Sequence, residues 1–405
     1  MRDVRRANRA SLLTDLFHGG RQSRQQLGDT TALSQASVSN LVGEMIEEGL
    51  VEEAGLVGSD GGRPRALLRV APGYGYVVGA DVGESRVAVE LYDLAMSRLG
   101  AAGYRLADPS DHESVTQLLI RGLADVTTQA DISRDEVLGF GVGVVGVVDR
   151  EGLVHSQTTG WEAVPLGDVL GAATGLPVFV ENGAKTVGQA EMWFGAGRGA
   201  RHAVIVLIGR GVGAAVVRDG RGHRGPDSGA AEWGHTTLVY EGLPCRCGAR
   251  GCLEAYIGSD AVSVRLAEAT GSEPDPRLLA RTLVGEVSGP AAVVVTETVG
   301  YLGAGIADLV NLFSPERIVL SGPIGAALGE RFLPEIRAAA AGHALRHPFS
   351  TTRIDVCQLG PDAVAMGAAT LPIARLLADG GMAVTDPHTV VSRAAHRRQI
   401  SRVRG

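Results

Sequence analysis

Three of the four cysteines of this 405-residue chain lie within eight residues, at Cys245, Cys247 and Cys252, and His235 stands ten residues before the first of them. A disulfide framework spreads its cysteines along the chain, so this clustering indicates a metal site. Three thiolates and one imidazole form a complete tetrahedral set for zinc, with no position left for a substrate. We therefore predict a structural Zn site; the alternative is a group of ordinary buried cysteines. The fourth, Cys357, lies in an apolar stretch and is expected only to fill the core.

Two short glycine-containing turns have the chemistry to cradle phosphate groups. Residues 83–85 (Gly-Glu-Ser) and 209–211 (Gly-Arg-Gly) each join two short apolar runs. Backbone N–H groups in such turns can bind phosphate oxygens, although glycine is also what an ordinary tight hairpin requires. Two such hairpins, about 125 residues apart and each opening an α/β segment, predict a duplicated, actin-like fold of two lobes.

The elements expected around these turns alternate between strand and helix. Strands are expected over residues 76–82, 86–91, 138–148, 177–180, 203–208, 212–217, 318–320 and 354–359, and helices over 113–130, 181–195 and 363–378. We predict a first lobe of residues 71–185 with 363–380, and a second lobe of residues 186–362 that carries the zinc site and the dimer surface. Residues 381–405 are expected to be a disordered tail.

The first 70 residues have the pattern of a winged helix-turn-helix. Amphipathic helices are expected over residues 8–18, 24–29 and 35 to about 48, the third beginning after the cap residue Ser34. A strand, a glycine-rich tip and a second strand follow as the wing. The third helix presents polar residues on its first turns, where a recognition helix reads bases, and the cationic wing can enter a minor groove. The residues predicted to contact DNA are Arg24, Gln35, Ser37, Ser39, Asn40, Arg63 and Arg65.

The charge distribution agrees with a DNA-reading head on a body that does not bind DNA. The net charge is −7, but residues 1–70 carry nine basic and nine acidic side chains, while residues 71–380 carry 24 and 35. An acidic body does not attract nucleic acid, so any DNA contact must come from the head, where arginines cluster before residue 30: Arg2, Arg5, Arg6, Arg9, Arg21 and Arg24. The alternative for the head is a three-helix protein-interaction or dimerisation module.

Nothing in the chain indicates export or membrane insertion. The basic N-terminus lacks a following apolar region, so it does not have the pattern of a signal peptide. The most apolar later stretch, residues 291–313, is interrupted by Glu297, Asp308 and Asn311. We therefore expect a cytoplasmic protein without a membrane partner.

The order of these motifs resembles the ROK family of repressors, open reading frames and sugar kinases, from about Asn8 to Ala378. The most specific match is the segment from Gly229 to His235 (Gly-Ala-Ala-Glu-Trp-Gly-His), followed by Cys-Arg-Cys-Gly-Ala-Arg-Gly-Cys-Leu-Glu over residues 245–254. Weaker matches are Asp-Val-Gly-Glu-Ser at 81–85, Glu-Asn-Gly-Ala-Lys at 181–185, Gly-Arg-Gly-Val-Gly at 209–213 and Asp-Ala-Val-Ala-Met-Gly-Ala-Ala at 362–369. The winged helix in front is similar to the regulator branch of that family.

The resemblance implies a sugar pocket in which Asn182, Glu232, His235 and Glu254 face a hexose. A polyol needs several fixed donors and acceptors, and carboxylates that accept from neighbouring hydroxyls are the usual solution. If His235 uses one ring nitrogen for zinc, the other can donate to a hydroxyl. The alternative is a relict pocket that no longer binds a sugar.

The resemblance also implies that phosphoryl transfer has been lost. The family's kinases carry Asn-Asp where this chain has Asn182-Gly183, and that Asp is the base that accepts the sugar hydroxyl proton. Loss of such a base costs roughly 10²–10⁴-fold in rate. The family's Gly-Gly-Thr turn contains Glu84 here, and Arg210 stands at the usual Thr position of the second turn. We therefore expect no enzyme activity.

The only lysine of the chain, Lys185, stands two residues after Gly183. A Lys at this place can add positive charge near the pocket and favour an anionic sugar, or it can be a solvated residue on a helix surface.

Taken together, these features predict a sugar-responsive transcriptional regulator, with repression the commoner sign in the family it resembles. A homodimer or tetramer would read an inverted-repeat operator on double-stranded DNA. The alternatives are an ATP-dependent sugar kinase, or a regulator whose pocket is relict or takes an effector that is not a sugar.

Overall fold

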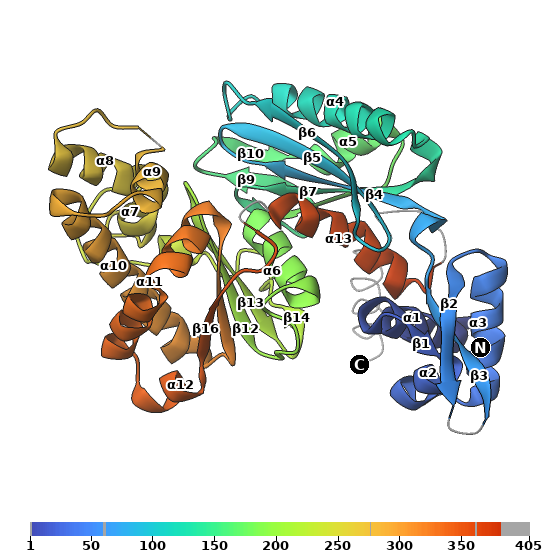
Figure 1. Ribbon diagram of the computed structural model, residues 1–405. Helices are drawn as coiled ribbons and strands as arrows, with labels where there is room; N and C mark the ends of the chain where they lie inside the picture. Colours follow the sequence, from blue (N-terminus) through green and yellow to red (C-terminus); the bar gives the residue numbers. More distant parts are fainter. Residues whose placement is uncertain (1, 60–61, 276, 361–362, 382–405) are drawn as a thin grey trace, which may run out of the picture. The chain divides into compact units, whose positions relative to one another are not determined.

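The structure is a computed structural model, and it describes residues 2–59, 62–275, 277–360 and 363–381 (Figure 1). The predicted tail therefore lies, from residue 382 on, outside the described residues. The chain divides into two compact units: residues 1–142, 166–180 and 368–405, and residues 143–165 with 181–367. Residues 143–165, 181–185 and 363–367 fall in the second unit, whereas the sequence assigned them to the first lobe. The predicted domain boundaries stay predictions.

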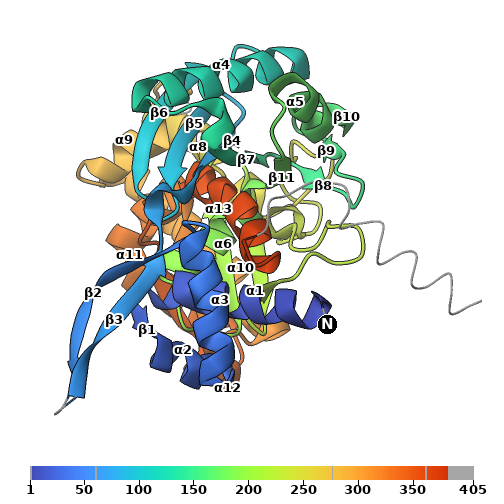
Figure 2. The ribbon, with the colours of Figure 1, turned by 90° about the vertical axis from the view of Figure 1, so that its right-hand side faces the viewer.

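The N-terminal residues form three helices and a three-stranded sheet. The helices are α1 (Arg2–Gly19), α2 (Arg24–Thr31) and α3 (Gln35–Glu47), and the strands β1 (Gln22–Ser23), β2 (Val51–Ser59) and β3 (Gly62–Val70) have the order β1-β3-β2. Ser23 and Gln26 make a capping box on α2, and Ser34 caps α3 as predicted. Figure 2 shows β2 and β3 as a long two-stranded ribbon beside α2 and α3. This is the predicted winged helix-turn-helix, with a longer first helix than residues 8–18.

A five-stranded sheet with the order β11-β7-β4-β5-β6 follows. Its strands are β4 (Tyr76–Val82), β5 (Arg86–Asp93), β6 (Arg98–Arg105), β7 (Val137–Val144) and β11 (Val178–Asn182). Helix α4 (His112–Ala130) packs against β5 and β6 and contacts α5 (Leu166–Thr174) (Figure 1). A small sheet of β8 (Val147–Val148), β9 (Val154–Ser156) and β10 (Trp161–Val164) belongs to the second unit. The strand expected over residues 138–148 is thus two strands.

The second unit contains another five-stranded sheet, with the order β14-β13-β12-β15-β16. Strand β12 (Ala203–Ile208) forms a hairpin with β13 (Val212–Arg218) and runs parallel to β15 (Arg317–Ser321). The outer strands are β14 (Arg221–Gly222) and β16 (Arg353–Val356), so the strand expected over residues 354–359 ends at Val356. Both large sheets contain an early antiparallel hairpin, and the predicted duplicated, actin-like α/β fold is confirmed.

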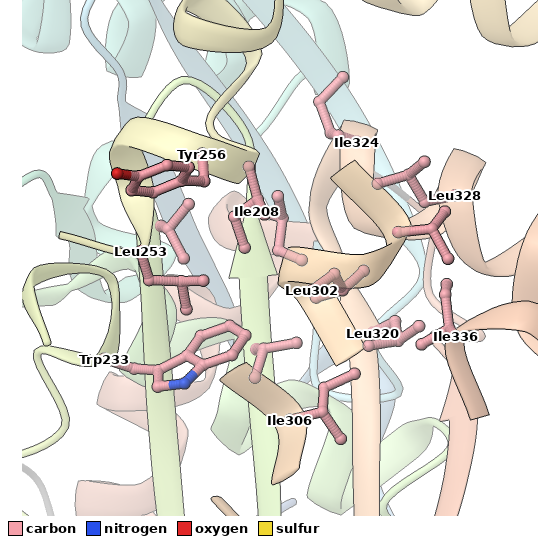
Figure 3. Packing of buried hydrophobic residues seen from close by; sticks show 14 of the residues in the cluster. Ile208, Trp233, Leu253, Tyr256, Leu302, Ile306, Leu320, Ile324, Leu328 and Ile336 are labelled. Carbon is pink, nitrogen blue, oxygen red and sulfur yellow. The ribbon is translucent and has the colours of Figure 1, made fainter. Parts of the chain in front are cut away.

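Alternate residues of β12 face two different helical layers, as the two-residue period of a strand requires. Val204, Val206 and Ile208 belong to the larger core, with α8 (Ser259–Thr270), α9 (Leu278–Val284), α10 (Gly289–Phe313) and α11 (Gly322–His343). Figure 3 shows part of this core, where Leu302 and Ile306 of α10 lie between Trp233, Leu253 and Tyr256 on one side and Leu320, Ile324, Leu328 and Ile336 on the other. Ala203 and Ile205 face the core that contains α6 (Gly183–Phe194).

Helix α10 is long and apolar enough to cross a membrane by length and composition alone. However, 61% of its most apolar window is buried inside the protein. A helix that is apolar on most sides and packed among other helices is typical of a core helix.

The last described helix, α13 (Ala363–Ala378), packs closely enough to require glycine both in the helix and in a strand beside it. A Cβ atom on Gly141 of β7 would lie 1.8 Å from the Ala368 carbonyl oxygen, and one on Gly367 would lie 2.2 Å from that of Thr186. Such distances exclude any side chain without a backbone shift. Glycine makes up 57 of the 405 residues, and some of these glycines are therefore required by close helix packing and not by turns.

The remaining short elements are three 3₁₀ turns and two helices: η1 (Pro72–Tyr74), η2 (Arg134–Glu136), η3 (Trp233–His235), α7 (Glu254–Ile257) and α12 (Arg346–Thr351). The helix expected over residues 181–195 begins only at Gly183, because Glu181 and Asn182 complete β11.

Candidate functional site

The predicted metal ligands converge in one place. The ligand atoms of His235, Cys245, Cys247 and Cys252 all lie within 4.8 Å of one another. His235 is the last residue of η3, and a tight loop brings the cysteines together, with the Cys245 N–H donating to the Ala249 carbonyl at 2.8 Å. Cys252 pairs with Thr237 in an isolated β-bridge, which ties the loop to the segment after η3.

The spacing of these atoms fits a zinc ion. In a tetrahedral site with Zn–S near 2.3 Å and Zn–N near 2.05 Å, two sulfur atoms stand about 3.8 Å apart and a sulfur and a nitrogen about 3.6 Å apart. The Cys247 and Cys252 Sγ atoms are 3.8 Å apart, and Cys245 Sγ lies 3.7 Å from His235 Nδ1. These two separations are close to the tetrahedral values, and the four ligand atoms could hold a metal ion such as Zn. Nε2 of His235 is then the ring nitrogen left over.

Glu254, the first residue of α7, stands beside this cluster and is 5% exposed. Its Oε2 accepts a hydrogen bond from the Val212 N–H at 2.9 Å, and its Oε1 accepts one from Arg246 Nη2 at 3.2 Å. The carboxylate is therefore held between the second hairpin turn and the cysteine loop. Since a carboxylate has about four acceptor positions, it keeps capacity for a hydroxyl.

Asn182 is the N-cap of α6 and uses most of its hydrogen bonds inside the protein. Its Oδ1 accepts from the Ala184 N–H at 2.9 Å and the Lys185 N–H at 3.3 Å, and its Nδ2 donates to the Gly146 carbonyl at 2.7 Å. The side chain therefore starts the helix and holds the segment around Gly146 against it. One N–H of the amide is left for another partner.

Glu232 and Lys185 lie close enough to affect each other's ionisation. Burial raises the pKa of Glu232, and the charges of His235 and Lys185 oppose that rise. Burial lowers the pKa of Lys185, while Glu181 and Glu232 oppose that change. The Lys185 ammonium donates to the carbonyl of Ser228. Lys185 is thus half-buried and held by the protein, and the interpretation as a solvated helix-surface residue is not what the structure shows.

The structure thus brings Glu232, His235, Glu254 and Lys185 together, with Asn182 at the start of the helix that carries Lys185. Two further charged residues that the sequence reasoning missed lie nearby. Buried Glu181 accepts the Asn182 N–H at 2.9 Å and pairs with Arg224 at 2.6 Å. Glu181 could have been predicted as a site residue because it directly precedes Asn182, whereas nothing in the sequence pointed to Arg224.

The predicted DNA readers lie on α2, α3 and the wing. Gln35, Ser39 and Asn40 are exposed on the first turns of α3. Ser37 is half-buried, with its Oγ 2.9 Å from that of Ser34, so it also belongs to the helix cap. Half-buried Arg24 opens α2, and Arg65 is exposed on β3; Arg63 lies on the same strand, with its side chain outside the described residues.

The profile of the ROK family matches residues 77–375 of this chain, which is well over half of it. The chain belongs to the ROK family. Among curated relatives, the xylose repressor of Caldicellulosiruptor bescii is 27% identical over 389 residues, covering 92% of this chain and 97% of the relative. The transcriptional dual regulator NagC of Escherichia coli is 26% identical over 85% of this chain and 86% of its own. A glucokinase of Streptomyces coelicolor is 28% identical but covers only 73% of this chain, against 97% of its own.

Among solved structures, too, a regulator covers more of this ROK protein than a kinase does. A ROK family transcriptional regulator described as a homologue of E. coli MLC matches with a TM-score of 0.76, at 24% identity, over 93% of this chain and 98% of its own. This likeness shows the fold. A ROK family glucokinase from Streptomyces griseus in complex with glucose and AMPPNP matches with a TM-score of 0.65, at 26% identity, over 73% of this chain and 99% of its own. The regulators therefore match nearly the whole chain and the kinases a shorter part.

In this ROK protein the second turn is bonded to residues at the start of α8, and the first turn has the closing hydrogen bond of an ordinary hairpin. In the second turn, Arg210 bonds Asp260 through Nε at 2.9 Å and Nη2 at 2.8 Å, and the Gly209 carbonyl accepts the Ser259 N–H at 2.9 Å. A phosphate at this turn would meet the Asp260 carboxylate. The first turn is closed by a bond from the Gly83 N–H to the Arg86 carbonyl at 3.0 Å.

Gly183 is the first residue of α6, and its environment does not explain the absence of a side chain. A Cβ atom there would meet the Val144 carbonyl oxygen at 3.6 Å and Val364 at 3.6 Å, which are ordinary van der Waals contacts. The φ angle is not in the left-handed region. A Cβ atom therefore fits at this position without a close contact, so the backbone here does not demand glycine.

Proposed function

We propose that this protein is a sugar-responsive, DNA-binding transcriptional regulator that acts as a repressor. The observation that carries the proposal is a winged helix-turn-helix joined to a sugar-kinase-like body that has Gly183 at the family's base position. The relatives that match nearly the whole chain include a xylose repressor and NagC, whereas the glucokinases match 73% of it. We also expect the protein to act in the cytoplasm.

Zinc is the metal that we propose for the His/Cys₃ cluster. A bound ion would hold η3, which carries His235, and the loop that leads into α7, which carries Glu254. It would therefore fix two effector-binding residues relative to each other without touching the effector. Nδ1 of His235 faces Cys245, so Nε2 is free to bond a sugar hydroxyl.

The proposed effector is a sugar or sugar derivative held by Asn182, Glu232, His235 and Glu254. Support comes from their assembly on one unit, where the half-buried Glu232 carboxylate lies close enough to His235 and to the buried Glu254 carboxylate to interact with both electrostatically. Adjacent hydroxyls of a polyol can each donate to a carboxylate oxygen, and such charge-assisted bonds are short and directional. The half-buried Lys185 ammonium adds a cation to the same group.

We propose that the body does not transfer phosphate. Gly183 cannot accept a proton, and the Arg210–Asp260 pair places a carboxylate at the second turn. Either feature alone would slow phosphoryl transfer, since this chemistry depends on positioning and on cations around the phosphate. The competing function, an ATP-dependent sugar kinase, requires a base at the position of Gly183, which has no side chain.

Regulation is then a linkage between two binding equilibria. A sugar that prefers one arrangement of the body changes the population that holds two winged helices at the spacing of an inverted repeat. A complete switch from 1:99 to 99:1 needs about 5.5 kcal/mol of differential affinity. Several hydroxyl contacts at about 1 kcal/mol each reach this value only together. A homodimer, or a tetramer built from dimers, is the assembly that we expect.

The test begins with selecting duplexes from a random pool with the full-length protein and sequencing them. Enrichment of an inverted repeat is expected. Hexoses, pentoses, amino sugars and their phosphates are then screened for a thermal shift, and each active compound is tested for release of the selected duplex. ADP release with ATP and the same sugars is measured in parallel, and clear turnover would overturn the proposal. No shift with any sugar would indicate a relict pocket or a different effector.

A further inference from the structure

Two ion pairs connect α1 to the recognition helix α3, and they are spaced one helical turn apart on both helices. Arg5 pairs with Glu44 and Arg9 pairs with Glu48. Residues four apart on a helix lie on the same face, so the pairs are equivalent in sequence. Their surroundings differ: the side chain of Arg5 is 61% exposed and that of Arg9 only 8%.

The buried pair has a third partner that the exposed pair lacks. Arg9 bonds Glu48 through both terminal nitrogens, with Nη1 to Oε1 at 2.8 Å, and its Nε donates to the carbonyl of Gly380. The hydrogen bond with Glu48 raises the pKa of Arg9, and the same bond lowers the pKa of Glu48. Two carboxylate oxygens of Glu48 and the Gly380 carbonyl oxygen therefore bind the charged guanidinium, whose planar shape suits these three acceptors.

Gly380 belongs to the motif that ends α13. The Gly381 N–H donates to the Leu376 carbonyl at 2.8 Å and the Gly380 N–H to the Leu377 carbonyl at 3.0 Å, which is a Schellman motif. Both glycines have positive φ, +68° and +78°. A Cβ atom on Gly381 would lie 2.1 Å from Cδ2 of Leu50, so the end of α13 is packed tightly against the winged helix domain.

Through Glu48 the contact reaches the end of the predicted recognition helix. Glu48 is the C-cap of α3, and its own N–H closes the last turn of that helix. Arg9 therefore joins the end of the recognition helix to the end of α13. At its other end α13 buries Ala363 and Val364 in the core that contains α6 and β12 of the second unit. One helix of about 24 Å thus has its first turn in the lobe that carries the candidate effector site and its last turn on the DNA-binding domain.

We propose that Arg9 is a positioning residue that couples α13 to the recognition helix, so that a change in the body alters DNA binding. The role in effector response rests on the proposed function; the joint between the two helix ends does not. Arg9 is buried, so it acts through Glu48 and Gly380 and not by contact with DNA.

The test compares Arg9→Lys with the matched variant Arg5→Lys, both in the full-length protein. Lysine keeps the charge but cannot bond both carboxylate oxygens and a carbonyl in the same plane. Hydrogen exchange is followed at residues 44–50 and 376–381. We expect Arg9→Lys to speed exchange at both segments by about tenfold or more, because one buried joint holds both. Arg5→Lys should change only the α1–α3 face, within about twofold.

The second readout is the ratio of DNA affinities with and without sugar, measured on the selected duplex with the sugar that gives the largest thermal shift in the wild type. Allosteric coupling typically changes affinity about 5- to 150-fold. Arg9→Lys is expected to reduce that ratio below about twofold, while Arg5→Lys keeps it. A lost ratio with an unchanged affinity of Arg9→Lys for the sugar identifies coupling and not a damaged pocket.

The outcomes separate the two proposals. If no sugar changes the DNA affinity of the wild type, the proposed sugar response fails, and the exchange data still decide whether Arg9 joins the helices. The inference is overturned if hydrogen exchange at residues 44–50 and 376–381 is no faster in Arg9→Lys than in Arg5→Lys. It is also overturned if a sugar changes the DNA affinity of the wild type and changes that of Arg9→Lys by the same ratio. Glu48→Gln is the second variant, since it keeps the shape and removes the charge. In a double-mutant cycle its effect should not add to that of Arg9→Lys.

Discussion

The metal cluster leads to the sharpest prediction: without Cys252 the protein loses its metal and much of the stability of the second unit. Cys252 is 1% exposed, directly precedes core residue Leu253, and forms the bridge to Thr237. The change is Cys252→Ala, and the matched control is Cys357→Ala. Cys357 is half-buried and lies outside the cluster, so both variants remove a sulfur atom but only one removes a ligand.

The expected magnitude follows from the geometry. Cys245 Sγ lies 3.7 Å from His235 Nδ1, and the Cys247 and Cys252 Sγ atoms are 3.8 Å apart, both close to the separations in a tetrahedral Zn site. These ligands therefore need little rearrangement to bind the ion. Structural zinc contributes about 10–16 kcal/mol in small peptides. In this unit a hydrophobic core already supplies part of the stability, so we take about 3 kcal/mol as a lower bound. For a unit of roughly 200 residues that corresponds to a Tm about 6–12 °C lower.

The assay is elemental analysis of the purified chain, followed by thermal unfolding with and without a chelator. We expect about one zinc per chain in the wild type and in Cys357→Ala, and none in Cys252→Ala. The chelator should lower the Tm of the first two proteins toward that of Cys252→Ala. A metal-free wild type that unfolds at the same temperature as a zinc-supplemented sample would refute the assignment.

Three further predictions concern the pocket and the helix joint. Asn182→Ala should destabilise the protein without any sugar present, by about 1–3 kcal/mol, because it removes both the cap of α6 and the bond to Gly146; chemical denaturation measures this. Gly183→Asp should fold with a Tm equal to or above that of the wild type, since the Cβ has space and a carboxylate suits a helix N-terminus, and ADP release should stay at background because the second turn remains blocked. Glu48 has a lowered pKa, so its pairing with Arg9 stabilises the fold above the unfolded pKa and is lost as the pH falls through the folded one; acid unfolding of Glu48→Gln should therefore be less steep than that of the wild type.

Each of the three has a matched control. Asp111 caps α4 at an exposed site, where it accepts the Ser114 N–H and the Ser114 hydroxyl but bonds no distant segment. Asp111→Ala should therefore cost less than Asn182→Ala; equal costs would mean that the bond to Gly146 contributes nothing. Turnover by Gly183→Asp would show that the base alone was missing. Glu44 on the same face of α3 pairs with exposed Arg5, and Glu44→Gln should leave the acid response unchanged. An identical effect of Glu44→Gln and Glu48→Gln would contradict the role given to the buried pair.

The metal cluster and the winged helix were predictable because their signals are local. Four ligands within eighteen residues can meet only through one short loop, and a set of three cysteines and one histidine by itself indicates zinc as the expected metal. Ser34 precedes an apolar pattern of helical period, and the structure confirms both the cap and the helix. The two hairpins and their separation were equally readable, since glycine turns and apolar runs are marked in the chain itself.

The pocket was only partly predictable. The resemblance named Asn182, Glu232, His235 and Glu254, but it could not show that Asn182 caps α6 and bonds Gly146 across 36 positions. It also assigned Lys185 no partner, although its ammonium reaches the carbonyl of Ser228, 43 positions away. Hydrogen bonds between distant segments depend on how strands and loops are brought together, and no periodicity in the chain records them.

What the sequence determined by itself was the set of parts: a helix-turn-helix with a wing, two α/β lobes and a candidate set of four metal ligands. The resemblance to the ROK family added the expectation that Gly183 stands where the family's kinases carry their base. Only the tertiary structure decided which charged side chains are buried and which groups they bind. In the chain Arg9 is one of several N-terminal arginines expected near DNA, yet it is buried against Glu48 and a carbonyl 371 positions away. The reason is physical: helix and metal patterns arise from neighbours in sequence, whereas the fate of a charged side chain depends on which distant groups remove it from water and bind it there.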